Sequence, residues 1–230
     1  MTICHTVRIR SIISFAVGFG LFALVASSSV FGGILESKWA DRTIEGVKLA
    51  KEVSFQGAGK TFVLKPYASG IRKKKVALFW AKVYVAQIFT PEGAATPPTS
   101  VGSAYETLTQ QPLVALTMTF LRDVPAGRQR DAFEDALQAN GIDTNAEAIT
   151  PLFAMVEKAG DTKDTLTNTF VFERRSDATE WVHLENGRSE LQSIRFEKGM
   201  LSKILSIWFG KPADSGMERL QRQFLGKSDD

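Results

Sequence analysis

The chain has 230 residues and a mass of 25.3 kDa, the size of one domain or at most two small ones. Its hydrophobic fraction of 44% and charged fraction of 23% are those of an ordinary globular protein and exclude a disordered or collagen-like chain. One Cys and two His are too few for a Cys/His zinc site, a disulfide scaffold or most thiol chemistry.

The N-terminal residues have the pattern of a secretory signal peptide. Arg8 and Arg10 precede a charge-free run over residues 11–35, in which an apolar stretch is followed by small residues. We therefore predict a signal peptide over residues 1–28 and a periplasmic or secreted protein. The run is also long enough to span a bilayer, so an uncleaved inner-membrane anchor over residues 11–35 remains an open alternative.

Removal of residues 1–28 changes the composition. The only Cys and one of the two His lie in this segment, so the mature chain keeps a single titratable imidazole, His183. Without the two arginines of the segment, the 28 basic residues fall to 26 against 25 acidic ones. A near-neutral exported protein is not expected to bind nucleic acid, and the basic run Arg72–Lys75 is interpreted as a solvated turn. We interpret His183 as a satisfied strand residue, and we predict no metal and no cofactor.

Strands come first along the mature chain. The predicted extended segments are a hairpin of Val53–Phe55 and Thr61–Leu64, a strand over Val76–Phe89 that is apolar on both faces, and a strand over Leu113–Leu121. Lys65–Gly70 is interpreted as a turn, and Pro91–Ser103 as a loop.

Helices, strands and helices follow in that order. The predicted elements are a helix capped by Asp123 and ended by Gly141, a capping box at Thr144–Glu147, a short helix capped by Thr150, strands over Thr165–Glu173, Thr179–Leu184 and Leu191–Phe196 with a hairpin turn at Asn186-Gly187, and two amphipathic helices over Met200–Trp208 and Met217–Phe224. This order predicts an α+β fold with a mainly antiparallel sheet.

Arg72 is a candidate binding residue. It follows Gly70-Ile71 just before a strand whose two faces are apolar. A guanidinium at the mouth of an apolar layer is suited to a carboxylate or a phenolate, because it offers a planar fork of N–H donors. A surface Arg in a basic turn is the alternative.

Five segments resemble the bacterial chalcone isomerase-like family. Gly70-Ile71-Arg72 followed by Lys82–Ala86 is similar to the family's G-x-R and K-V-Y-V-A signature, and three more segments agree in order: Glu45–Val47, Phe120–Val124 and Leu205–Pro212. The resemblance covers residues 43–226. It implies an open-faced β-sandwich, a large antiparallel sheet with helices packed on one side and a ligand cleft between them.

The superfamily to which the resemblance points contains both enzymes and binding proteins. Its plant enzymes cyclise a chalcone through a phenolate held beside an Arg, while hydroxyl groups and water stabilise the enone oxygen; its plastid members bind fatty acids. Arg72 matches that Arg through its G-x-R context. A strand Thr of the enzymes corresponds to Phe79, and their helix Tyr and Asn fall near Arg130 and Leu137. With these hydroxyls missing or moved, the resemblance favours binding over cyclisation.

The leading prediction is an exported protein that binds a small apolar carboxylate or phenolate ligand, with a fatty-acid-like carboxylate the first choice. Arg72 would anchor the anion, and Tyr84 would be a wall or a hydrogen-bond partner. Membrane contact is predicted only through an uncleaved N-terminal segment. Two alternatives remain open: an isomerase of the intramolecular lyase type that acts on a chalcone-like enone, with no catalytic residue assigned, and a non-catalytic envelope protein that binds a partner.

Overall fold

The computed structural model describes the residues 34–57, 59–93, 98–187 and 190–228. The predicted signal peptide, residues 1–28, lies outside the described residues. So does the alternative anchor over residues 11–35, except for Ile34 and Leu35, which lead into the first strand. None of the helices in the described ranges has the length and hydropathy needed to cross a membrane.

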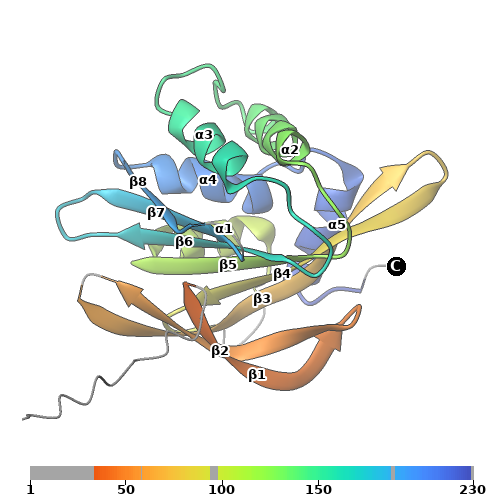
Figure 1. Cartoon of the computed structure of the whole chain (residues 1–230), viewed down its shortest axis with the longest axis horizontal. Helices are drawn as coiled ribbons and strands as arrows, with labels where there is room; N and C mark the ends of the chain where they lie inside the picture. Colours follow the sequence, from red (N-terminus) through yellow and green to blue (C-terminus); the bar gives the residue numbers. More distant parts are fainter. Residues whose placement is uncertain (1–33, 58, 94–97, 188–189, 229–230) are drawn as a thin grey trace, which may run out of the picture. The chain divides into compact units, whose positions relative to one another are not determined.

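Eight strands in the described residues form an antiparallel sheet whose spatial order is the order along the chain (Figure 1). The strands are β1 (Leu35–Ile44), β2 (Val47–Gly57), β3 (Lys60–Val76), β4 (Phe79–Thr90), β5 (Leu113–Phe120), β6 (Thr167–Arg174), β7 (Glu180–Asn186) and β8 (Gln192–Phe196). The predicted antiparallel sheet is confirmed, and short turns connect several of its strands.

The helices of the described residues pack on one face of this sheet (Figure 1). They are α1 (Val101–Gln110), α2 (Ala126–Ala139), α3 (Thr150–Ala159), α4 (Met200–Phe209) and α5 (Ser215–Phe224). The outer part of the β1–β2 hairpin lies against the opposite face. The predicted open-faced α+β sandwich is therefore confirmed.

Alternate residues of the central strands face two separate apolar clusters. Ile88 and Leu116 belong to the larger cluster, which contains the helices, whereas Phe89 and Ala115 belong to a smaller cluster with Phe55 of β2. Successive side chains of a strand point to opposite faces, so a strand covered on both sides is apolar throughout. This explains the two apolar faces predicted for the strand over Val76–Phe89, although the predicted start is wrong: Val76 ends β3 and pairs with Phe79, the first residue of β4.

Strand β3 forms the corner between the sheet and the β1–β2 hairpin. Its first residues pair with β2, and the residues from Lys65 onward pair with β4, with a register shift between Pro66 and Ala68. The predicted turn at Lys65–Gly70 is therefore wrong: the shift accommodates Pro66, which has no N–H for the ladder, within a continuous strand. The basic run Arg72–Lys75 is likewise strand, not turn.

Two elements were not predicted at all. Strand β1 is mostly exposed and rich in charged residues, so it lacks the apolar alternation typical of a strand. Helix α1 begins inside the segment Pro91–Ser103, which was interpreted as a loop; Ser100 caps it and exchanges hydrogen bonds with Ser103. Only Ala104 and Leu108 of this helix are buried, which is a weak periodic pattern.

The predicted helix caps of the middle segment are also wrong. Asp123 does not cap α2, since its carboxylate accepts hydrogen bonds from Lys163 and from the Asp164 N–H, each at 3.0 Å. Thr150 is the first residue of α3 and not its cap. Thr144–Glu147 begins no helix. Tertiary contacts have displaced the local capping interactions that the spacing suggested.

Candidate functional site

A cleft of about 1040 Å³ lies between the helix-covered face of the sheet and α2. We call it the Arg72 cleft. Its wall is mainly apolar, and the apolar side chains come from β4, β5, α2, α4 and α5: Val83, Met118, Phe120, Phe133, Trp208 and Met217. Basic and acidic residues of α2 and of the loop before it line the rest, among them the exposed Arg128, Asp131 and Asp135. Such a cleft suits a ligand with an apolar body and a polar end.

The polar part of the cleft begins where β3 and β4 pair. Arg72 lies directly opposite Tyr84, and the next pair joins Lys73 to Lys82, so Val83 is an extra residue on β4. This is a β-bulge, which bends a strand and changes the direction of neighbouring side chains. Arg72 and Tyr84 both line the Arg72 cleft, and the Arg72 side chain is only 10% exposed.

Arg72 is paired inside the protein with a carboxylate. Its Nη2 donates to Asp214 Oδ2 at 2.6 Å, and its Nη1 donates to the Lys73 carbonyl oxygen. The other oxygen of Asp214, Oδ1, accepts the N–H groups of Gly216 and Met217 at 2.9 Å each and so caps α5. One carboxylate therefore serves as counter-ion and as helix cap.

The start of α5 packs closely against one side of the guanidinium, at Gly216. A Cβ atom at Gly216 would overlap the Lys73 carbonyl and the Arg72 side chain, so this position requires glycine. Burial raises the pKa of the Asp214 carboxyl, but Arg72 and the two capping N–H groups outweigh burial and the net pKa is lowered. Asp214 is therefore ionised at neutral pH.

Tyr84 supplies a hydroxyl group to the same cleft. Its oxygen accepts the Trp208 indole N–H at 3.3 Å, and its own proton has no acceptor among the residues that the structure describes. Burial raises the pKa of Tyr84, and the nearby Arg72 only partly opposes this. The hydroxyl thus stays protonated and can donate a hydrogen bond to a ligand.

A buried polar network holds α2 above the sheet. Gln129 of α2 donates to Thr162 at 2.8 Å and accepts from Asn168 of β6 at 2.8 Å, while Thr162 donates to Asn168 at 3.3 Å. Gln129 also lines the cleft. A fully bonded network of this kind fixes the helix at one position, and so helps to fix the shape of the cleft.

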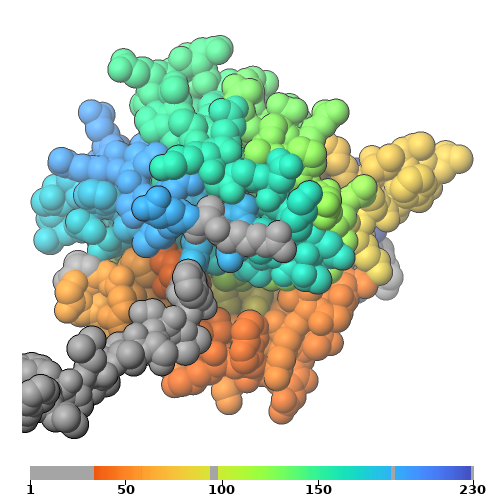
Figure 2. All heavy atoms as spheres, viewed as in Figure 1, coloured from red at the N-terminus to blue at the C-terminus, as the bar shows by residue number. Residues whose placement is uncertain are grey.

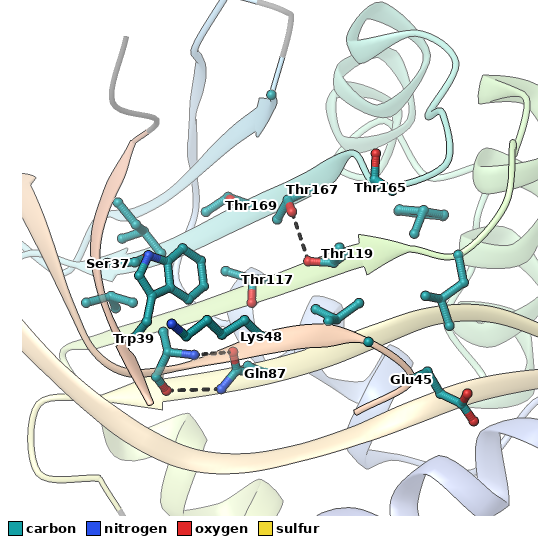
Figure 3. Close-up of a pocket in the computed structure, with 18 of the residues that line it drawn as sticks. Ser37, Trp39, Glu45, Lys48, Gln87, Thr117, Thr119, Thr165, Thr167 and Thr169 are labelled. Atoms are coloured by element: carbon teal, nitrogen blue, oxygen red, sulfur yellow. Dashed lines mark hydrogen bonds between the residues drawn. The ribbon is translucent and has the colours of Figure 1, made fainter. Parts of the chain in front are cut away.

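A second hollow, of about 810 Å³, lies on the opposite face under the β1–β2 hairpin (Figure 3). We call it the threonine groove. Its floor is a row of directly paired residues on four neighbouring strands, Gln87, Thr117, Thr169 and Glu185. The β1–β2 hairpin is bonded to both ends of this row: Gln87 exchanges two hydrogen bonds with the backbone of Ala50, at 2.9 and 3.2 Å, and Glu185 accepts the N–H of the residue before β1 at 2.5 Å.

The two middle residues of the row, Thr117 and Thr169, have hydroxyls without a hydrogen-bond partner within the described ranges. The neighbouring pair, Thr119 and Thr167, bond to each other at 2.9 Å. The Trp39 indole lies above the two middle residues (Figure 3). The described lining residues of the groove include no arginine. The groove offers neutral hydroxyls and lacks the guanidinium that characterises the first cleft.

The structure brings together the two predicted ligand-binding residues, Arg72 and Tyr84, on one cleft wall, and their role in binding stays a prediction. The other positions that the resemblance singled out do not line this cleft. Phe79 is exposed at the start of β4, Arg130 lies over the Phe153 ring and bonds to Glu157, and Leu137 is fully buried.

His183 lies on the other face of the sheet, away from the Arg72 cleft. Its Nδ1 is 2.8 Å from Ser193 Oγ and its Nε2 is 3.5 Å from the Glu173 carboxylate. These contacts agree with the interpretation of a satisfied strand histidine. Within the described part of the chain there is no group of three or more His, Cys, Asp or Glu side chains that could hold a metal ion.

Sequence reasoning missed Asp214 and the threonine row. Asp214 precedes Ser-Gly at the start of a helix, and this spacing could have identified it as a cap. Its pairing with Arg72 joins residues 142 positions apart, and no local pattern predicts it. The strand predicted over Leu113–Leu121 contains Thr117 and Thr119, but the partner threonines on β6 depend on the strand register.

Comparisons with known proteins agree with this architecture. A family described as chalcone isomerase-like matches residues 41–226. The crystal structure of a fatty-acid binding protein of Arabidopsis thaliana is similar, with a TM-score of 0.55 and 13% identity, over 82% of this chain and 96% of that one. No curated protein matches the chain in sequence. At this identity the structural likeness shows the fold alone.

Proposed function

The chain belongs to the chalcone isomerase-like family, and we propose that it binds a small apolar carboxylate, such as a fatty acid, in the Arg72 cleft. The observation that carries the proposal is the pair of buried donors on one cleft wall. Tyr84 has an O–H without an acceptor among the described residues, and Arg72 uses two of its five N–H groups in the hydrogen bonds given above. A ligand carboxylate would accept from both.

The rest of the cleft supports an apolar tail. Val83, Phe120 and Phe133 form a surface beside the two donors that an alkyl chain could cover. Burial of each methylene group stabilises a complex by about 0.8 kcal/mol. The binding of fatty acids by a plant protein of the same fold supports this choice of ligand class.

Asp214 sets the strength of the proposed binding. A ligand carboxylate must share the guanidinium with the Asp214 carboxylate, and two anions on one cation repel each other. The internal carboxylate also stabilises Arg72 when no ligand is bound, because a buried unpaired guanidinium is costly. We therefore expect moderate affinity in the native chain and tighter binding when the charge of Asp214 is removed.

Cyclisation of an enone is the function that this cleft supports less well. An enolate oxygen needs several preorganised donors. The described lining residues include the hydroxyl of Tyr84 but no Ser, Thr or Asn. Isomerase activity stays a prediction, and it is tested by following the absorbance of naringenin chalcone against its spontaneous rate.

We also propose that the protein is exported and belongs with the bacterial members of the family. The support is the pattern of residues 1–28 alone. N-terminal sequencing of the protein purified from its native envelope tests this. A mature chain that starts near residue 29 is expected, and an intact Met1 in a soluble cytoplasmic fraction would overturn the proposal.

The binding proposal is tested first by lipid extraction of the purified protein followed by mass spectrometry, and then by calorimetric titration with dodecanoate. Arg72→Ala should weaken binding at least about tenfold, because hydrogen bonds to charged groups contribute 1.5–3 kcal/mol. Tyr84→Phe should weaken it by about two- to tenfold.

Two further variants make the test specific. Asp214→Asn keeps a capping side chain for α5 but removes the competing charge, so dodecanoate binding should become tighter by a few fold. Arg130→Ala removes an arginine of α2 that does not line the cleft and should leave the affinity unchanged. If dodecanoate does not bind, or if Arg72→Ala and Arg130→Ala behave alike, the proposal fails.

A further inference from the structure

The hairpin between β3 and β4 ends in an exposed apolar tip. Val76, Leu78 and Phe79 are 43%, 98% and 62% exposed, and they are three of the six large hydrophobic side chains that are exposed in the described part of the chain. The hairpin projects beyond the helices and the rest of the sheet (yellow in Figures 1 and 2). Scattered exposed hydrophobic residues are ordinary, but three at the end of one projection indicate a contact surface.

The turn itself does not require these residues. Val76 pairs with Phe79, so the turn consists of Ala77 and Leu78, and Ala77 has a φ of +52°. A two-residue hairpin turn with positive φ at its first position favours glycine there and a polar residue beside it. An Ala-Leu turn is therefore less stable than a Gly-Asn turn would be, which suggests that the tip residues serve something other than folding.

Basic side chains surround the apolar tip. Lys74 and Lys75 are exposed on β3, and the Arg219 guanidinium of α5 lies 4.6 Å from the centre of the Trp80 ring. No acidic residue occurs between residues 71 and 85. An apolar apex with lysines and a tryptophan behind it is the arrangement of a peripheral membrane anchor, in which apolar side chains enter the interface and cations bind lipid phosphates.

We propose that this tip docks on the surface of an anionic lipid bilayer, with Leu78 and Phe79 inserted at the boundary between headgroups and acyl chains. The site is convex and narrow, so it offers no groove to a peptide. Its charge complements anionic lipid headgroups, and each lysine near such a surface contributes about a fivefold gain in affinity at low ionic strength.

The same hairpin also forms part of the Arg72 cleft. Lys74, Val76 and Ala81 line the cleft together with Arg72. A docked tip would therefore place one side of the cleft close to the bilayer, from which an apolar carboxylate could enter. This last step rests on the proposed ligand, whereas docking of the tip does not.

Vesicle co-sedimentation tests the docking. The chain is used without residues 1–28, because their apolar run could bind lipid itself and because every described element lies between residues 34 and 228. Vesicles of phosphatidylcholine with phosphatidylglycerol should bind the protein, vesicles of phosphatidylcholine alone should bind it much less, and added salt should weaken the binding.

Variants of the tip separate its two contributions. Ala77→Gly/Leu78→Asn should reduce vesicle binding at least about tenfold, since a large apolar side chain no longer inserts, while the thermal stability of the protein stays the same or rises. Lys74→Gln/Lys75→Gln should reduce binding to anionic vesicles by about thirtyfold at low salt. The matched pair Lys48→Gln/Lys51→Gln removes the same charge from exposed positions of β2 and should have little effect.

Each outcome decides the proposal. It is overturned if anionic vesicles do not bind the protein, which would leave a protein partner for the tip, or if the variants of the tip and of β2 lose binding equally. Arg72→Ala should bind vesicles like the native chain. Loss of dodecanoate binding with normal vesicle binding would then overturn the proposed ligand and leave the docking intact.

Discussion

The two faces of the sheet are built from alternate residues of the same strands, yet they are covered in different ways. On one face, Leu116 and Phe170 pack into a continuous apolar core with the helices. On the other face, the intervening residues Thr117 and Thr169 lie in a polar row under the β1–β2 hairpin. The helices pack mainly apolar side chains on the sheet, and the polar groups beneath them, such as Gln129 and Asn168, are bonded to each other. The hairpin is bonded only to the two ends of the row and leaves the hydroxyls of Thr117 and Thr169 without a partner in the described residues.

The two hollows differ in chemistry for the same reason. The Arg72 cleft is a gap in the apolar layer, and at its inner wall the Arg72 guanidinium is paired with Asp214 while the Tyr84 hydroxyl accepts the Trp208 N–H. The threonine groove lies beside the smaller apolar cluster, and its lining combines hydroxyl, apolar and charged side chains of both signs without an arginine among the described residues. The two hollows therefore present different polar groups: a buried guanidinium in the first and a row of hydroxyls in the second.

The largest expected difference is in the loss of unfolding free energy when a tryptophan on each face is replaced by alanine. Trp208 is 1% exposed and packs edge-on against Phe133 at 5.5 Å between ring centres, whereas Trp39 is 53% exposed over the threonine groove. Trp208→Ala should reduce the free energy of unfolding by about 3–5 kcal/mol, and Trp39→Ala by less than about 1 kcal/mol. Urea unfolding of both variants measures this. Equal losses would contradict the contrast between the faces.

An intermediate effect is expected within the polar row. Gln87→Met keeps the length of the side chain but leaves the buried N–H and C=O of Ala50 without partners, which should cost about 2–3 kcal/mol. Thr117→Val removes a hydroxyl that has no protein partner in the described residues and should change stability by less than about 0.5 kcal/mol. The same unfolding measurement applies, and a large loss for Thr117→Val would mean that its hydroxyl is bonded.

The smallest expected effect is on the pH dependence of the free energy of unfolding, to which His183 on one face and Asp214 on the other contribute at different pH. Burial lowers the pKa of His183 below its ordinary 6.5, although Glu173 opposes this, so the stability that it contributes is present above pH 6.5 and is lost as the pH falls through the folded pKa. For Asp214, whose pKa lies below the ordinary 3.8, the corresponding loss begins below that pH. Unfolding free energies measured from pH 8 to pH 3 should fall in two separate steps.

Variants assign the two steps. His183→Gln should remove the step at higher pH and leave the other. Asp214→Asn should make the step at lower pH smaller, and the carboxyls of Glu52 and Asp177, whose pKa values are also lowered, should keep the rest of it. A single step that disappears in both variants would show that the two faces titrate as one unit.

Much of the fold could be predicted from the sequence because its strongest patterns are local. The strand predicted over Leu113–Leu121 and the apolar stripe of Met200–Trp208 correspond to the observed β5 and α4. Strands β7 and β8 form the predicted hairpin, but Asn186 still belongs to β7 and the last pair is Leu184 with Gln192, so Asn186-Gly187 is not a two-residue turn. The predictions failed where tertiary structure overrides local chemistry. Lys65–Gly70 contains Pro and Gly but continues as strand, since β3 changes partners there.

The candidate site was predictable only in part. The chemistry of Arg72 and its place before an apolar strand indicated an anion-binding side chain, and the family resemblance indicated a cleft. That Arg72 already has a counter-ion depends on the approach of α5 to β3, which brings distant parts of the chain together. The threonine groove depends on strand register and on the path of β1, neither of which has a sequence pattern.

The double role of Asp214 makes the first turn of α5 a natural reporter of events at Arg72. The amide protons of Gly216 and Met217 are held by one oxygen of this carboxylate, and the guanidinium is held by the other. Any molecule that weakens the hydrogen bond between Arg72 and Asp214 changes the charge distribution over both oxygens of the Asp214 carboxylate. The nuclear magnetic resonance signals of these two amides would therefore register occupancy of the cleft without an added label.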